Sequence, residues 1–238
     1  MLIVVHSVIK RSFTLAATLI GESKSFELQS HKCSNSQRLK CSEMTVRTWM
    51  TERAFIAFEH FHLKSCIDFK PRQTEKCYLS VRKNPGCYSY VSRIIKSGQV
   101  VSIGEQCDHL GIVEHEFLHV LGLYHEQSRY DRDDYITIMW KNIKDGTVTS
   151  FKKSTPTSST TFNAPYDYLS LMHYGKNFFS KNMENTIVTK LPQYQDKIGQ
   201  RMEMSPTDIY KLNHLYNCSK FSLLLKSPLY IHYFKMFA

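Results

Sequence analysis

Apolar side chains recur at helical spacing in three parts of the chain, and they predict three helices. The first helix covers residues 44–63 and the second covers residues 111–121. The third opens at Ser205-Pro206, where serine is a favourable N-cap and proline suits the first turn. The apolar positions are Val46, Met50, Ala54, Ala57, Phe58 and Phe61 in the first helix, and Ile209, Leu212 and Leu215 in the last. We interpret their side chains as core packing.

Shorter apolar stretches between these helices predict strands. They cover residues 66–69, 77–81, 99–103 and 135–139. A turn is predicted at Asn84-Pro85-Gly86, and residues 147–163, which are rich in serine and threonine, are expected to form a surface loop. Helices and short strands together indicate an α+β fold.

The second predicted helix begins a group of residues with the spacing of a zinc site. They run His115-Glu116-Phe117-Leu118-His119-Val120-Leu121-Gly122-Leu123-Tyr124-His125-Glu126. His115 and His119 lie one helical turn apart, so their imidazoles point the same way at roughly 5–6 Å. Gly122 can end the helix in a left-handed conformation, which brings His125 round as a third ligand. Three ligands leave one position of a tetrahedral zinc open, as in catalytic sites, and Glu116 lies within reach of a water there.

This motif is the metzincin pattern, and with Glu126 directly after the third histidine it resembles the astacin family of zinc endopeptidases. Other blocks of the chain resemble the family in the same order. They are Ser65-Cys66-Ile67-Asp68-Phe69, Gly86-Cys87-Tyr88-Ser89-Tyr90, Gln127-Ser128-Arg129 and Ser170-Leu171-Met172-His173-Tyr174. The resemblance covers residues 45–218, and we take residues 44–218 as a peptidase domain.

The resemblance implies the two-lobe metzincin fold with a cleft that crosses the zinc. The N-terminal lobe would hold a twisted mixed sheet and two long helices, one of which carries the metal. The C-terminal lobe would be mostly irregular and would end in a helix. Val101 and Ser102 would lie in the edge strand above the cleft, where a protein or peptide substrate binds by strand addition.

The resemblance also implies hydrolysis of peptide bonds with one Zn²⁺ held by His115, His119 and His125. Glu116 would act as the general base toward a zinc-activated water and would then deliver a proton to the departing amine. Tyr174 would ligate zinc at rest and swing to hydrogen-bond the oxyanion.

Three further residues receive roles only through this resemblance. Met172 would form a hydrophobic floor beneath the histidines, and Glu126 matches the glutamate near which the family buries its freed amino terminus. Arg201 aligns with a position where some members carry a basic specificity residue, which implies a preference for acidic side chains after the cleaved bond. The alternative for Arg201 is an ordinary surface arginine.

Seven cysteines without a Cys-x-x-Cys motif indicate an oxidising compartment, so we expect the protein to be secreted. Spacing alone does not assign their connectivity. The resemblance implies the pairs Cys66–Cys218 and Cys87–Cys107. Of the cysteines left over, which are Cys33, Cys41 and Cys77, the first two are close enough in sequence to pair locally.

Composition is that of one globular domain with tails, because 42% of the residues are hydrophobic and 13% are aromatic. The net charge of +10 favours a solvated basic surface over a nucleic-acid site, since no nucleic-acid motif accompanies it. A basic surface also favours acidic protein substrates. The oligomeric state has no signal in the sequence.

The ends of the chain are harder to interpret. Residues 1–21 fit a signal peptide with an unusually apolar start, and the alternatives are a buried strand or a flawed start site. Residues 22–43 lack the Phe-x-Gly-Asp motif of the astacin prosegment, whose aspartate blocks the zinc. This segment therefore does not indicate how the enzyme would be kept inactive. Residues 219–238 form an apolar tail that is too short and interrupted for a membrane span, and it receives no role.

Two other functions compete with the peptidase. One is a catalytically impaired astacin-like protein that uses its cleft as a binding module, which the unusual N-terminal segment favours. The other is a small secreted cysteine-rich protein with a structural zinc, but such sites close with a fourth protein ligand and none is obvious near this motif.

Overall fold

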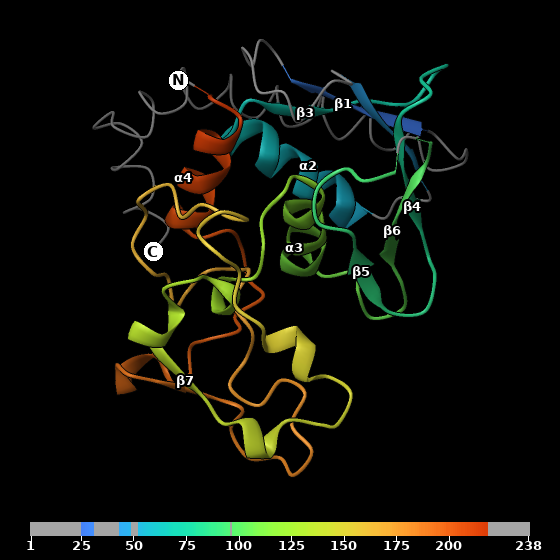
Figure 1. Cartoon of the computed structure of the whole chain (residues 1–238). Coiled ribbons are helices and arrows are strands. Elements are labelled where there is room, and N and C mark those ends of the chain that lie inside the picture. The colour runs from blue at the N-terminus through green and yellow to red at the C-terminus, as the bar shows by residue number, and fades with distance from the viewer. Residues whose placement is uncertain (1–24, 31–42, 49–51, 96, 219–238) are drawn as a thin grey trace, which may run out of the picture.

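Two lobes of different character make up the described part of the chain, which in this computed structural model comprises residues 25–30, 43–48, 52–95 and 97–218. The upper lobe holds a six-stranded sheet with the helices α2 (Glu52–Lys64) and α3 (Leu110–Val120) (Figure 1). The lower lobe follows α3 and is mostly irregular. The chain then returns as α4 (Pro206–Leu215), which lies beside α2 (Figure 1). The expected α+β architecture in two lobes is therefore confirmed.

The sheet is mixed, with strand order β3-β1-β2-β4-β6-β5. Its strands are β1 (Ser25–Ser30), β2 (Glu43–Thr48), β3 (Ile67–Phe69), β4 (Tyr78–Arg82), β5 (Cys87–Ser89) and β6 (Gln99–Ile103). The β2–β4 and β4–β6 pairs are parallel, whereas β1–β2, β1–β3 and β5–β6 are antiparallel. The sheet thus includes β1, which comes from a segment to which the sequence assigned no structure.

The predicted helix over residues 44–63 is wrong in its first part, because Glu43–Thr48 is the strand β2 and helix α2 begins only at Glu52. Thr45, Val46 and Thr48 are β-branched, which stiffens the side chain at χ1 and favours extended backbone. Parallel pairing with β4 then outweighs the helical spacing of the apolar positions.

The expected edge strand is also wrong, because β6 lies inside the sheet between β4 and β5. Val101 and Ser102 are both fully buried, and the Ser102 hydroxyl donates to the carbonyls of Asn84 and Gly86. They therefore have no backbone edge or side chain to offer a substrate. The sheet ends instead at β5, a short antiparallel strand that carries the half-exposed Tyr88.

An aromatic cluster fixes the zinc-motif helix in the upper lobe. The rings of Phe58 in α2 and Phe69 in β3 stack with centroids 4.1 Å apart. Phe117 of α3 meets Phe58 edge-on at 4.8 Å and Phe69 at 5.1 Å. Because Phe117 is completely buried, this packing anchors the face of α3 that points away from the histidines.

The lower lobe has a second core built from tyrosines and a small antiparallel pair of strands. The strands are β7 (Ile136–Ile138) and β8 (Ile187–Thr189), and the single-turn 3₁₀ helices are η1 (Glu126–Ser128), η2 (Arg132–Asp134), η3 (Trp140–Asn142), η4 (Val148–Phe151) and η5 (Pro192–Tyr194). The interpretation of residues 147–163 as a surface loop is wrong at Phe151, which is fully buried and packs edge-on against Tyr174 at 5.7 Å.

Two disulfides close the described domain. Cys66 is bonded to Cys218, which links the residue before β3 to the segment just after α4, and Cys87 is bonded to Cys107, which links β5 to the loop before α3. These are the two pairs that the resemblance implied. Cys33 and Cys41, for which local pairing was considered, lie outside the described residues.

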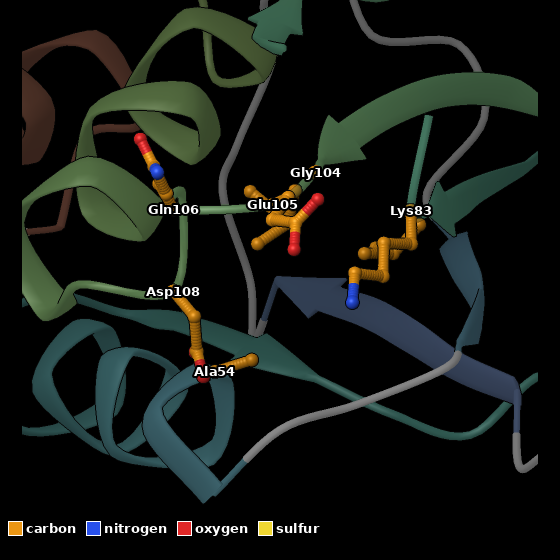
Figure 2. Close-up of a pocket in the computed structure, with 8 residues that line it drawn as sticks. Ala54, Lys83, Gly104, Glu105, Gln106 and Asp108 are labelled. Carbon is orange, nitrogen blue, oxygen red and sulfur yellow. The ribbon is translucent and has the colours of Figure 1, made fainter. Parts of the chain in front are cut away.

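A pocket of about 120 Å³ opens between the start of α2 and the loop that joins β6 to α3 (Figure 2). It is lined by Ala54, Val81, Lys83, Ile103, Gly104, Glu105, Gln106 and Asp108. No histidine of the zinc motif is among them, so this pocket is distinct from the site described below.

The expectations for the two ends of the chain rest on residues 1–21 and 219–238, which lie outside the described residues. Among the helices that the structure does describe, none combines the length and apolarity needed to cross a bilayer.

The two disulfides should contribute unequally to stability because they close loops of different length. Their sequence separations are 152 and 20 residues, for which loop-closure entropy predicts about 5 and about 3 kcal/mol. Replacing Cys66 and Cys218 by alanine should therefore lower the free energy of unfolding more than replacing Cys87 and Cys107, as measured by urea denaturation. Equal losses would contradict an entropic origin.

Candidate metal centre

The end of α3 brings the third histidine back toward the first two. Gly122 has a φ of +104°, a left-handed conformation that glycine adopts without strain. Its N–H donates to His119 O at 2.8 Å, and the N–H of Leu123 donates to Leu118 O at 3.0 Å. These two bonds form a Schellman motif, which stops the helix and reverses the chain toward His125.

The three imidazoles converge on one point. Nε2 of His125 lies 3.0 Å from Nε2 of His119 and 3.3 Å from Nε2 of His115. Nitrogens bound to one tetrahedral zinc at 2.0–2.1 Å lie about 3.3–3.4 Å apart, so the spacing fits that ion. Within the described residues, no further His, Cys, Asp or Glu joins this group of potential ligands.

The chemistry of the donor set fits zinc as well. Nδ1 of His115 bonds to Leu171 O and Nδ1 of His119 bonds to Leu123 O, each at 2.9 Å. A carbonyl oxygen only accepts hydrogen bonds, so each of these two rings carries its proton on Nδ1. The lone pair of each Nε2 therefore faces the centre. Burial lowers the pKa of His119 to about 4 and holds the pKa values of His115 and His125 well below their usual range. The rings are therefore neutral ligands at physiological pH.

Glu116 lies beside this centre and is almost completely buried. Its Oε2 is a buried carboxylate oxygen without a hydrogen-bond partner in the described structure. Burial raises the pKa of Glu116 to about 7, and the charge of Arg201 acts in the opposite direction. Such an oxygen is poised to take a proton from a molecule that enters the site.

The turn at Met172 adjoins the metal centre, because the carbonyl of the preceding Leu171 bonds Nδ1 of His115. Met172 is 1% exposed and belongs to the core of the upper lobe, where Leu118 and Phe117 also lie. Its carbonyl accepts a hydrogen bond of 3.0 Å from the N–H of Glu126, the residue after the third histidine. The Met172 side chain is thus part of the apolar core of the upper lobe.

Asp208 of α4 holds the same turn from the other side. Its carboxylate accepts hydrogen bonds from the Ser170 hydroxyl at 2.6 Å and from the N–H groups of Leu171 and Ser205 at 2.8 and 3.0 Å. With the Ser205 hydroxyl it also forms the capping box that starts α4. The Asp208 carboxylate therefore caps the start of α4. It also fixes the turn whose Leu171 carbonyl orients His115.

Tyr174 lies against the third histidine, with ring centroids 4.4 Å apart. Its N–H donates to the side-chain oxygen of Gln127 at 3.0 Å, and burial raises the pKa of its phenol. Phe151 and Phe178 pack around the ring, at centroid distances of 5.7 and 4.5 Å. Tyr174 is thus part of the wall of the metal centre.

Arg201 is not an ordinary surface arginine. Its Nη1 donates to the carbonyls of Leu171, His173 and Gln200 at 3.0, 3.1 and 2.8 Å. Its backbone lies against α3 so closely that a Cβ on Gly111 would meet Arg201 O at 2.1 Å. The guanidinium therefore binds the carbonyls on both sides of Met172. It lies near the metal centre, because Leu171 O also bonds His115.

Glu126 is buried and carries three contacts from separate parts of the chain. Its Oε1 accepts from Asp167 N at 2.9 Å and from Arg129 Nη1 at 3.1 Å, and its Oε2 lies 2.5 Å from Lys211 Nζ. The carboxylate thus joins the segment after His125 to α4 and to the segment that precedes the methionine turn.

Comparison with known proteins agrees with this geometry. The sequence model of the astacin peptidase family matches residues 42–217, which is most of the chain. The chain belongs to the astacin family.

Several astacin-like proteins are similar to the chain. Meprin A subunit beta from Rattus norvegicus is 51% identical over 163 residues, which are 68% of this chain and 23% of the meprin subunit. Zinc metalloproteinase nas-13 from Caenorhabditis elegans is 41% identical over 173 residues, which cover 72% of this chain and 38% of that protein. This chain therefore spans only about a quarter to two fifths of these two relatives.

A solved astacin-like structure also matches. It is high choriolytic enzyme 1, a hatching enzyme zinc-protease from the medaka fish Oryzias latipes, with a TM-score of 0.66 and 37% identity. The match covers 73% of this chain and 87% of that chain. The fold of the described astacin domain is thus found in a zinc protease of known structure.

Some residues of the site have weak or no sequence signals. Asp208 follows Ser205 by three residues, so a capping box was visible, but its bonds to Ser170 and Leu171 were not. No local sequence pattern marks Lys211 as part of the site, because its partner Glu126 lies 85 residues away in the sequence.

Zinc added to metal-free protein should raise the melting temperature, because a ligand that binds only the folded state stabilises it. At a free zinc concentration about 1,000 times the dissociation constant the gain is about 4 kcal/mol. His125→Ala should remove most of this increase, since two nitrogens remain. Differential scanning fluorimetry checks both statements, and magnesium at the same concentration is the control.

Proposed function

We propose that this chain is a secreted zinc-dependent endopeptidase that hydrolyses peptide bonds in proteins. The observation that carries the proposal is the convergence of three Nε2 atoms beside the buried Oε2 of Glu116, which has no hydrogen-bond partner in the described structure. Membership of a peptidase family supports it, and two disulfides support an oxidising, extracellular compartment.

We assign His115, His119 and His125 to one Zn²⁺. When bound, zinc supplies a Lewis acid that polarises a carbonyl and makes water nucleophilic at neutral pH. Oε2 of Glu116 accepts the proton of the attacking water and delivers it to the nitrogen of the departing amine. The Tyr174 hydroxyl donates a hydrogen bond to the oxygen that develops negative charge.

The exposed edge of the sheet supplies a place for the substrate backbone. In the described sheet β5 pairs with β6 and has no strand on its other side, so the N–H and C=O groups of that side can pair with an extended peptide. Tyr88 and Tyr90, which are 45% and 50% exposed, border this edge. Backbone pairing of this kind suits an endopeptidase, because it holds a chain irrespective of its side chains.

A catalytically impaired binding protein and a structural zinc protein have less support. Among the described residues no fourth His, Cys, Asp or Glu joins the three histidines, which suits an open site. The carboxylate that proton transfer requires is present and buried beside that group.

Glu116→Gln should keep zinc and lose peptidase activity, because the amide preserves the shape but cannot accept the proton. We expect a loss of about 10²–10⁴-fold in kcat for casein or peptide hydrolysis, with zinc content measured on the same sample. The zinc-free wild type, prepared with a chelator, serves as the inactive control. Full activity of the zinc-loaded variant would refute the assignment.

We further propose that Arg201 selects acidic side chains directly after the cleaved bond. Among the described residues its three hydrogen bonds all use Nη1, which leaves the Nε–Nη2 edge for a carboxylate. Arg201→Ala should lower kcat/KM for Asp and Glu at that position about tenfold or more relative to neutral residues, and Arg201→Lys should lower it less. Cleavage-site profiling measures this, and an unchanged profile would exclude the role.

A further inference from the structure

The third histidine of the metal centre is held differently from the first two. His115 and His119 lie on α3, and each bonds a backbone carbonyl through Nδ1. Nε2 of His125 faces the centre, and among the described residues no backbone carbonyl bonds its Nδ1 as Leu171 O and Leu123 O bond the other two rings. The His125 ring therefore relies on its contact with Tyr174, at 4.4 Å between centroids, and on the backbone that carries it, which the next residue, Glu126, fixes.

Glu126 is fixed through both its backbone and its side chain. Its N–H donates to Met172 O at 3.0 Å, and its carboxylate is 3% exposed. Arg129 and Asp167 N hold Oε1, but Arg129 also binds Asp131 through two nitrogens, at 2.8 and 2.7 Å. Lys211 at 2.5 Å is the cation found on Oε2 in the described structure.

Charge balance makes Lys211 important in this cluster. Glu126 and Asp131 carry two negative charges, and Arg129 and Lys211 carry two positive charges. Without Lys211, Arg129 alone would face two carboxylates, so one net negative charge would stay buried in the cluster, and Oε2 of Glu126 would lose its cation one residue away from His125.

Helix α4 is a rigid support for this lysine. Lys211 is 7% exposed and its neighbour Leu212 is fully buried, so the stem of the lysine packs in the interior. The Cys66–Cys218 disulfide and the Asp208 contacts to Ser170 and Leu171 hold the same helix against the rest of the domain.

We propose that Lys211 is a positioning residue of the metal centre. Its ammonium group holds the Glu126 carboxylate, and Glu126 in turn keeps His125 at the distance from His115 and His119 at which one zinc binds all three. This inference rests on the proposed function only in taking these three histidines as zinc ligands. Lys211 touches neither the metal nor the substrate.

The test measures zinc affinity directly, by competition with a colorimetric chelator on the purified, oxidised full chain. Lys211→Met removes the charge and keeps the apolar stem, and we expect the zinc dissociation constant to rise about 10–100-fold. Lys211→Arg keeps a cation and should stay within about threefold of the wild type. The double variant Glu126→Gln/Lys211→Met leaves no lone charge and should bind zinc more tightly than Lys211→Met alone.

Lys64 offers a matched control. It is buried to nearly the same extent as Lys211, at 8% exposure, and its Nζ lies 2.9 Å from Glu203, away from the histidines. Lys64→Met therefore loses a buried lysine without touching the support of His125, and its zinc affinity should equal that of the wild type. The visible absorption spectrum of the Co²⁺-substituted protein should change in Lys211→Met and not in Lys64→Met, because it reports ligand geometry.

The outcomes separate this inference from the proposed function. Wild-type zinc affinity in Lys211→Met, or an equal loss in Lys64→Met, would overturn the positioning role while leaving the peptidase untouched. A wild-type protein that binds no zinc, or that binds zinc without hydrolysing peptides, would instead count against the proposed function.

Discussion

Three imidazole lone pairs have to face one point within about 2 Å of each nitrogen, and the rest of the described structure serves this constraint. The helix supplies two rings at the correct spacing, but it does not determine which ring nitrogen carries the proton. Two backbone carbonyls do so, Leu123 O after the helix and Leu171 O in the methionine turn. Because Leu171 lies on the segment that returns from the lower lobe, the ligands on α3 are oriented correctly only when this segment has packed against the helix.

Helix α4 joins the two lobes and explains why a helix at the end of the domain matters to a site far earlier in the sequence. It contributes Asp208 to the methionine turn and Lys211 to Glu126, and it is bonded to β3 through Cys66–Cys218. These contacts add to the apolar packing of Ile209 and Leu212 in the upper core, and they reach the loops of the lower lobe through side chains of α4. A site built this way is rigid at its ligands while the loops around it remain free to vary.

The sequence predicted the metal centre better than the fold around it, and the reason is physical. His115, Glu116, His119 and His125 fall within eleven residues, so local helix geometry and one glycine suffice to bring them together. The order of strands is not local, and the three-residue strand β5, which forms the edge, was too short to be predicted from the sequence. The strand at residues 99–103 was predicted correctly but was wrongly placed at the edge, and the start of α2 was placed too early because β pairing overrode apolar spacing. Lys211 was missed because a lysine on a helix normally faces water.

The 152-residue span between Cys66 and Cys218 has a consequence for how the protein is made. A ribosome releases the zinc motif long before it releases the segment that supplies Asp208 and Lys211, so the nascent chain exposes three histidines that have no scaffold. The histidines can therefore bind a metal ion in their final arrangement only after α4 has left the ribosomal exit tunnel and the Cys66–Cys218 disulfide has formed. During synthesis, the three histidines are thus present well before the residues that hold them in place.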